Sequence, residues 1–151
     1  MTNADRIEKK VLLKAPRSRV WRAIADAQEF GKWFRVNLDG PFVEGAMVRG
    51  KIAYPGYEHL TMEVQVEKIE PEHYFAYRWH PYAVDPGIDY STEPTTLVEF
   101  RLEETGSNTL LTIVESGFDQ IPIARRETAF RMNDQGWAEQ TRNIEQHVSQ
   151  P

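Results

Sequence analysis

One uninterrupted stretch near the C-terminus constrains the fold of this 151-residue chain more than any other feature. From about Ile123 to Val148 there is no proline, and Gly136 is the only glycine. At 100° per residue, one stripe of a helix would contain Ile123, Phe130, Trp137, Thr141, Ile144 and Val148. The helix would be roughly 40 Å long. A helix of this kind is stable only if its apolar stripe packs on another apolar surface.

The middle of the chain can supply that surface, because it reads as short strands separated by turns. Period-two alternation predicts strands at 6–14, 47–54, 61–69, 73–80, 96–103 and 109–116. Tight connections such as 106–108 (Gly-Ser-Asn) favour antiparallel pairing, because parallel strands need long crossovers. After Pro16, apolar residues at helical spacing (Val20, Trp21, Ile24) predict a short helix, and a second one is expected over 27–34.

This order of elements predicts an α+β fold of the helix-grip type. A curved antiparallel sheet of about six to seven strands would wrap around the long C-terminal helix, which closes a cavity. Two short helices would lie near the N-terminus. The length suits one domain, so we expect a single domain over 1–151.

Several short motifs fall in an order that is typical of one protein family. They are VLLKAP at 11–16 leading into VW at 20–21, FGKWF at 30–34, ESGF at 115–118 and GW at 136–137. With them the chain resembles the START-like (SRPBCC) superfamily, whose fold is that of the birch pollen allergen. The similar branch is related to the C-terminal domain of the activator of the heat-shock-protein-ninety ATPase. The resemblance covers 6–148 and implies a START-like domain, in a superfamily of lipid carriers, hormone receptors, cyclases and co-chaperone modules.

Composition excludes several classes of function. Cysteine is absent, which excludes disulfides, thiolate zinc sites and cysteine nucleophiles. A net charge of −5 and a pI near 5.4 weigh against a nucleic-acid partner, which would need a basic face. No apolar run approaches the ~20 residues of a membrane span, and the first residues lack the apolar stretch of a signal peptide. We therefore expect a cytoplasmic protein.

No catalytic motif is present in the sequence. The four histidines show no metal-binding spacing, and there is no nucleophile elbow, phosphate loop or dinucleotide-binding turn. We assign no catalytic residue and expect neither a metal nor another cofactor.

The aromatic residues are the first candidates for lining the cavity. They are Trp33, Phe34, Tyr54, Tyr77, Trp79, Phe118, Phe130 and Trp137, with Tyr90 added from a loop. The alternative at each position is an ordinary core residue. Tyrosine and tryptophan favour an amphipathic pocket, because their polar ends need partners when buried.

Three polar residues complete the predicted ligand-binding set. Glu115 shares a strand face with Leu111 and Ile113. Arg126 or its neighbour Glu127 lies near the apolar stripe of the helix, and so does Asn133 or its neighbour Asp134; we take Arg126 and Asn133. A buried carboxylate needs pairing, so Glu115 and Arg126 could form the polar end of the pocket. In the alternative, Glu115 lies in solvent and Arg126 extends along the surface.

Residues 81–94 form the longest irregular stretch between predicted strands. They carry Tyr82, Ile88 and Tyr90 and could form a lid. Equally, they could be a connection whose apolar residues cover the edge of the core. Residues 55–60, with Tyr57 and His59, are a second candidate rim.

Three functional hypotheses follow. We favour a binding module for a hydrophobic or amphipathic small molecule in the cavity. The resemblance implies a chaperone-interacting module as the second hypothesis. The third is a small cofactor-free enzyme, such as a cyclase or hydrolase, that uses the same cavity. The acidic composition and the sheet edges permit a homodimer.

Overall fold

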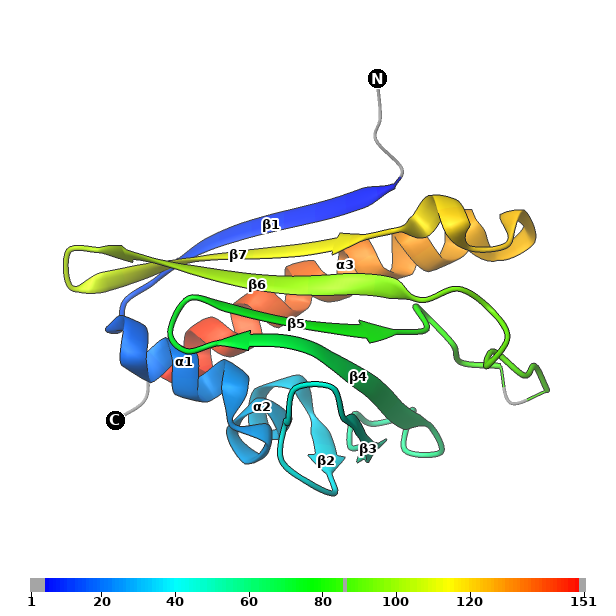
Figure 1. Ribbon diagram of the computed structural model, residues 1–151, viewed down its shortest axis with the longest axis horizontal. Coiled ribbons are helices and arrows are strands. Elements are labelled where there is room, and N and C mark those ends of the chain that lie inside the picture. Colours follow the sequence, from blue (N-terminus) through cyan, green and yellow to red (C-terminus); the bar gives the residue numbers. More distant parts are fainter. Residues whose placement is uncertain (1–4, 86, 150–151) are drawn as a thin grey trace.

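A seven-stranded antiparallel sheet dominates the computed structural model, which describes residues 5–85 and 87–149 (Figure 1). The spatial order is β1-β7-β6-β5-β4-β3-β2. The strands are β1 (Arg6–Leu13), β2 (Val36–Leu38), β3 (Met47–Ile52), β4 (Thr61–Glu70), β5 (Tyr74–Trp79), β6 (Thr96–Thr105) and β7 (Asn108–Ser116). A register shift between Val66 and Lys68 marks a bulge in β4, and bulges bend strands.

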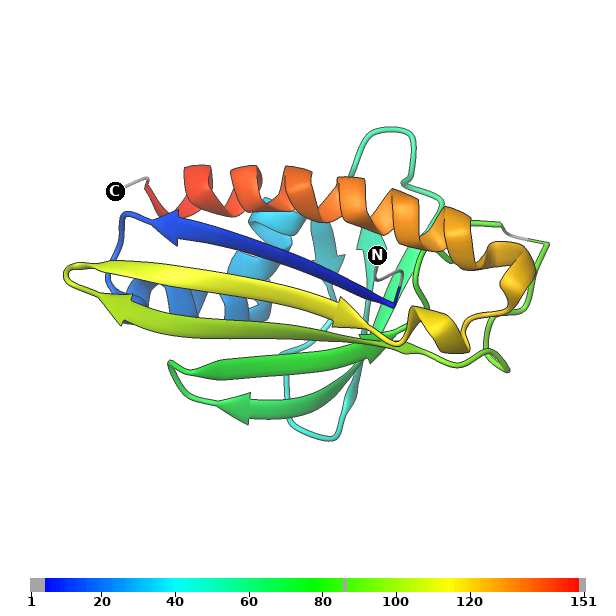
Figure 2. The same cartoon turned by 90° about the horizontal axis from the view of Figure 1, so that it is seen from above.

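The helices lie on one face of this sheet. They are α1 (Arg17–Ala25), α2 (Ala27–Phe34) and α3 (Ile123–Val148), and a short 3-10 turn, η1 (Phe118–Gln120), precedes α3. Figure 2 shows α3 running along the sheet with β1 beside it. It contacts β1, α1 and α2. The predicted α+β helix-grip architecture is confirmed.

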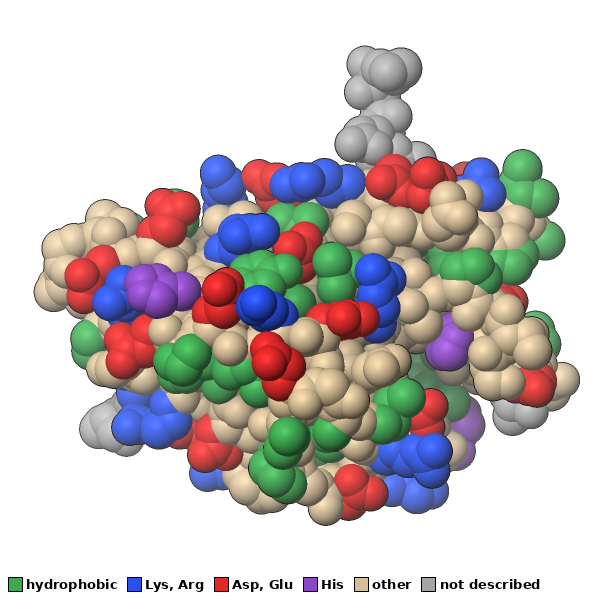
Figure 3. Space-filling model, in the orientation of Figure 1, with side chains coloured by type: hydrophobic (Ala, Val, Ile, Leu, Met, Phe, Trp, Pro, Cys, Tyr) green, Lys and Arg blue, Asp and Glu red, His purple; other side chains and the backbone are tan. Residues whose placement is uncertain are grey.

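The opposite face of the sheet is charged. In Figure 3, acidic and basic side chains alternate across it. Cross-strand ion pairs join Arg49 to Glu63 and Arg78 to Glu67. Exposed pairs of this kind add little stability. The apolar core therefore lies between the inner face of the sheet and the helices.

The apolar stripe of α3 is confirmed except at its first residue. Trp137, Ile144 and Val148 are buried, and Phe130 packs against the core. Ile123, however, is 82% exposed, so its predicted place in the stripe is wrong. The start of α3 extends beyond the ends of the strands (Figure 2), which leaves Ile123 without a surface to pack on.

Local sequence signals explain where α2 begins and ends. The Asp26 carboxylate accepts hydrogen bonds from the backbone N–H groups of Gln28 and Glu29, which caps the helix. Arg35 then adopts a left-handed conformation (φ 68°) and ends it. Within α2, a Cβ on Gly31 would lie 2.2 Å from the Val36 carbonyl oxygen, so only glycine lets β2 approach this closely.

The six predicted strands are all present, with ends that differ by one or two residues. The sequence analysis missed β2, because three residues are too few to display an alternation. None of the described helices is long and apolar enough to cross a membrane.

Candidate functional site

A pocket opens where β5 ends, between the β3–β4 hairpin, the β5–β6 loop and the middle of α3. It consists of two adjoining cavities of about 420 Å³ and 270 Å³, which we call the pocket. Both cavities are lined by Phe34, Ile52, Leu60, Trp79, Tyr82, Val84 and Asn133. This pocket is open and lies at one end of the sheet, beside the C-terminal helix.

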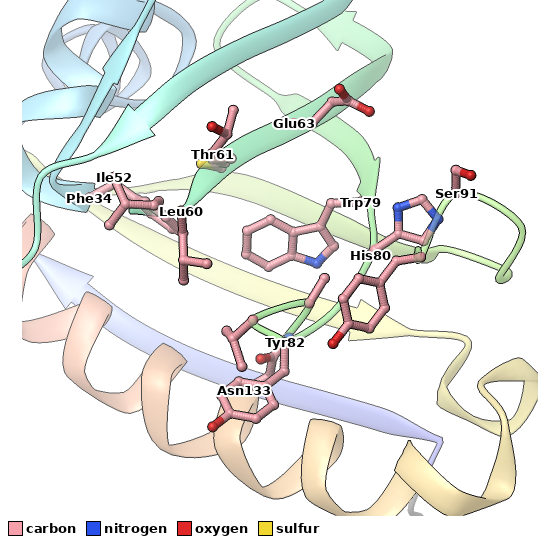
Figure 4. Close-up of a pocket in the computed structure, with 14 residues that line it drawn as sticks. Phe34, Ile52, Leu60, Thr61, Glu63, Trp79, His80, Tyr82, Ser91 and Asn133 are labelled. Atoms are coloured by element: carbon pink, nitrogen blue, oxygen red, sulfur yellow. The ribbon is translucent and has the colours of Figure 1, made fainter. Parts of the chain in front are cut away.

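Aromatic rings form much of the wall. The ring centroids of Phe34, Trp79 and Trp137 lie 5.9–6.1 Å apart in each pairing, so three elements contribute to one ring cluster. Figure 4 shows Trp79 in the middle of the pocket, with Leu60 to its left, His80 to its right and Asn133 below it. Tilted and edge-on contacts at this distance are favourable and hold the rings in place.

A fully buried carboxylate, Glu115, lies directly behind this wall. Its side chain on β7 accepts hydrogen bonds from the indole N–H groups of Trp79 and Trp137, both at 2.8 Å. The Nδ2 group of Asn133 donates to both carboxylate oxygens at 3.0 and 3.2 Å. The Thr96 hydroxyl donates at 2.5 Å. Three of these four donors also line the pocket.

The electrostatics of Glu115 are those of a carboxylate held by neutral donors. Burial raises the pKa of Glu115 above its ordinary value, and the four hydrogen bonds oppose that rise. Among the described residues, no lysine or arginine forms an ion pair with this side chain. Its negative charge is therefore stabilised by hydrogen bonds alone, and protonation is comparatively easy.

These features can be compared with known proteins. A family model described as "Activator of Hsp90 ATPase homolog 1-like protein" matches residues 14–149. The chain belongs to this family. The search of curated proteins found no match.

Solved structures share the fold of this family member at low sequence identity. Protein MLL2253 from Mesorhizobium loti is 20% identical with a TM-score of 0.75, and the match covers 95% of this chain and 96% of that protein. The Aha1 dimer from Colwellia psychrerythraea is 16% identical with a TM-score of 0.69, and 95% of each chain is covered. DynU16, from the dynemicin biosynthetic locus, is 21% identical with a TM-score of 0.74 over 96% of this chain. The chain spans only 47% of DynU16.

The predicted pairing of Glu115 with Arg126 is wrong in this family member. Arg126 instead donates from Nε to the Ile121 carbonyl oxygen at 3.1 Å. Both Arg126 and Asn133 lie on one helix face, but seven residues separate them by roughly 10 Å along the axis. Asn133, not Arg126, lies level with Glu115. The alternative that placed Glu115 in solvent is also wrong, because the residue is fully buried.

The structure brings about half of the predicted ligand-binding residues to the pocket. Those that line it are Phe34, Tyr54, Trp79, Tyr90, Asn133 and Trp137, with Glu115 behind them.

The other predicted residues lie elsewhere. Tyr77 and Phe118 are fully buried core residues. Trp33 is buried between helices and donates from Nε1 to the Ala23 carbonyl oxygen at 2.8 Å. Phe130 packs edge-on against Phe118 and, like Arg126, lines a separate cavity at the start of α3. For Tyr77, Phe118 and Trp33 the alternative, an ordinary core residue, is therefore the right one.

Sequence reasoning missed several residues of the wall. Ile52 could have been found, because it continues the inward alternation of Val48 and Gly50. Leu60 and Val84 gave no signal, since each lies in an irregular segment. Of the two candidate rims, the β5–β6 loop supplies Tyr82, Val84 and Tyr90, and the stretch 55–60 supplies Tyr57 and Leu60.

Proposed function

We propose that this protein binds a hydrophobic or amphipathic small molecule in the pocket. The observation that carries the proposal is a cavity of about 420 Å³ whose wall is mainly aromatic and aliphatic and which opens to solvent. Small-molecule sites are typically concave, mostly apolar and of about 300–1,000 Å³. The walls come from two helices, three strands and two loops that the rest of the fold holds in place, which supports a preformed site.

The polar groups of the lining support a neutral or positively charged ligand. Glu63 and Glu139 are the charged side chains among the described lining residues, which include no lysine or arginine. A ligand carboxylate would therefore meet negative charge without a cation to balance it. Asn133 uses Nδ2 for Glu115, so its Oδ1 atom can accept a hydrogen bond from a ligand hydroxyl. His80 also lies in the lining.

A neutral fluorescent hydrophobe, N-phenyl-1-naphthylamine, tests this proposal. We expect saturable binding to the wild type with one site per chain. Val84→Trp should fill the pocket and weaken binding at least about 10-fold, which corresponds to ~1.4 kcal/mol. Val43→Trp is the matched control, because Val43 is 52% exposed and does not line the pocket. It should change the dissociation constant less than about twofold.

Two results would contradict the proposal. One is a wild-type protein that shows no saturable binding. The other is equal affinity of Val84→Trp and Val43→Trp for the probe, because binding would then occur outside the pocket. This comparison requires that both variants unfold at the same urea concentration as the wild type.

The family description favours a second candidate function, an effect on the Hsp90 ATPase. This candidate predicts that the purified protein raises the ATPase rate of the chaperone in proportion to the complex formed. Val84→Trp separates the two functions, because it should weaken probe binding and leave a chaperone contact made elsewhere on the surface intact.

A further inference from the structure

Arg125, in the first turn of α3, contacts both ends of the β5–β6 loop. Its Nη1 atom donates to the carbonyl oxygens of Pro81 at 2.9 Å and Tyr82 at 3.1 Å. On the far side of the loop, Nη2 and Nε donate to the Glu93 carboxylate at 2.8 and 3.2 Å. The guanidinium also lies 4.7 Å from the centre of the Tyr90 ring. Figure 2 shows this loop beside the start of α3.

These contacts are well suited to hold the loop in one conformation. Both members of the ion pair are largely shielded from water, with 15% of the Arg125 side chain and 16% of the Glu93 side chain exposed. A planar guanidinium can bind a carboxylate and two carbonyl oxygens at once, whereas a lysine ammonium is a single point charge. The single side chain of Arg125 therefore makes all four of these hydrogen bonds to the loop.

The loop carries backbone strain at the point that Arg125 holds. Tyr82 has φ +49°, in the left-handed region that non-glycine residues rarely adopt. Such a conformation persists when surrounding contacts fix it. The Tyr82 carbonyl oxygen is one of the acceptors of Arg125. The Tyr82 side chain lines the pocket together with Val84 and Tyr90.

We propose that Arg125 is a positioning residue for the pocket: it fixes the β5–β6 loop so that Tyr82, Val84 and Tyr90 form one wall. The ligand-binding part of this inference rests on the proposed function. Arg125 does not itself line the pocket, so it acts on the ligand through the loop. His80 donates from Nε2 to the Glu93 carbonyl oxygen (3.1 Å), which ties the base of the loop separately. Loss of Arg125 should therefore release the loop and leave β5 and β6 paired.

The test combines two measurements on Arg125→Met, which keeps an apolar stem and removes the guanidinium. The first is chymotrypsin cleavage after Tyr82 and Tyr90 without ligand, followed by mass spectrometry. The second is the dissociation rate of N-phenyl-1-naphthylamine. Arg142→Met is the matched control, because Arg142 lies on the same helix and is exposed. Arg125→Lys keeps the charge without the planar fork, and it also serves if Arg125→Met fails to fold.

We expect cleavage at the two tyrosines and probe dissociation each to become at least about 10-fold faster in Arg125→Met, and less so in Arg125→Lys. Arg142→Met should match the wild type in both. Wild-type cleavage rates in both Arg125 variants would overturn the inference, and so would faster cleavage with unchanged probe dissociation. A wild type that binds no probe would overturn the proposed function, and the cleavage rates alone would then decide whether Arg125 positions the loop.

Discussion

At the scale of single residues, Glu115 is the unusual feature of this protein. The alternation with Leu111 and Ile113 on β7 correctly predicts that its side chain points inward. Its partners could not be predicted, because they depend on how far α3 is displaced along its axis against the sheet. A shift of two turns would have placed Arg126 where Asn133 lies.

Glu115→Gln tests the electrostatic environment of this carboxyl. The variant puts an NH₂ group among four donors, so we expect it to lower the free energy of unfolding by about 1–3 kcal/mol at acidic pH. The folded-state pKa of Glu115 is raised, so over a range of pH the unfolded chain has released the proton that the folded chain keeps. In that range the wild type loses up to ~1.4 kcal/mol of stability per pH unit, and the variant does not.

The advantage of the wild type over Glu115→Gln should therefore be largest below the ordinary glutamate pKa and shrink as pH rises. Urea titrations at a series of pH values measure it, with Glu103→Gln as the exposed control. A difference that grows with pH would mean that the hydrogen bonds lower the pKa of Glu115 by more than burial raises it.

At the scale of elements, periodicity predicts most of the fold. The 26-residue helix α3 begins and ends where the absence of proline and the stripe indicate. Periodicity fails where burial depends on another element: Ile123 belongs to the stripe by angle and has no sheet beneath it. Periodicity also fails to predict β2, whose three residues are too few to alternate. This strand lies close to α2, and Gly31 is what allows the close approach.

Alanine substitutions at two helical glycines should change the free energy of unfolding in opposite directions. A Cβ at Gly31 would collide with the Val36 carbonyl oxygen, so Gly31→Ala should destabilise the protein by about 1–3 kcal/mol. A Cβ at Gly136 would meet nothing within 4 Å, so Gly136→Ala should stabilise it by roughly 0.5–1 kcal/mol. Denaturant midpoints of the two variants check both values. Changes of the same sign would show that packing at one of these helices differs from the structure.

At the scale of the whole molecule, the pocket arises from segments far apart in the sequence. Phe34, Ile52, Trp79 and Asn133 belong to four different elements, and their meeting depends on the curvature of the sheet and the placement of α3. Sequence reasoning could predict a cavity with aromatic and polar lining, because the helix-grip order implies one. It could not separate wall from core among the aromatic residues, since Tyr77 and Trp79 share one face of the same strand and only Trp79 reaches the pocket.

The central claim is that the pocket beside Trp79 binds a small apolar molecule. The most direct test is a titration of protein labelled with ¹⁵N at the tryptophan indoles with N-phenyl-1-naphthylamine, followed by NMR. The side chains of Trp79 and Trp137 line the pocket and their indole N–H groups donate to Glu115 behind it, whereas the Trp33 indole N–H donates to a backbone carbonyl oxygen between helices. We predict that the Trp79 and Trp137 signals shift together and saturate while the Trp33 signal stays in place. Equal shifts at Trp33, Trp79 and Trp137, or none at a saturating concentration of probe, would contradict the account.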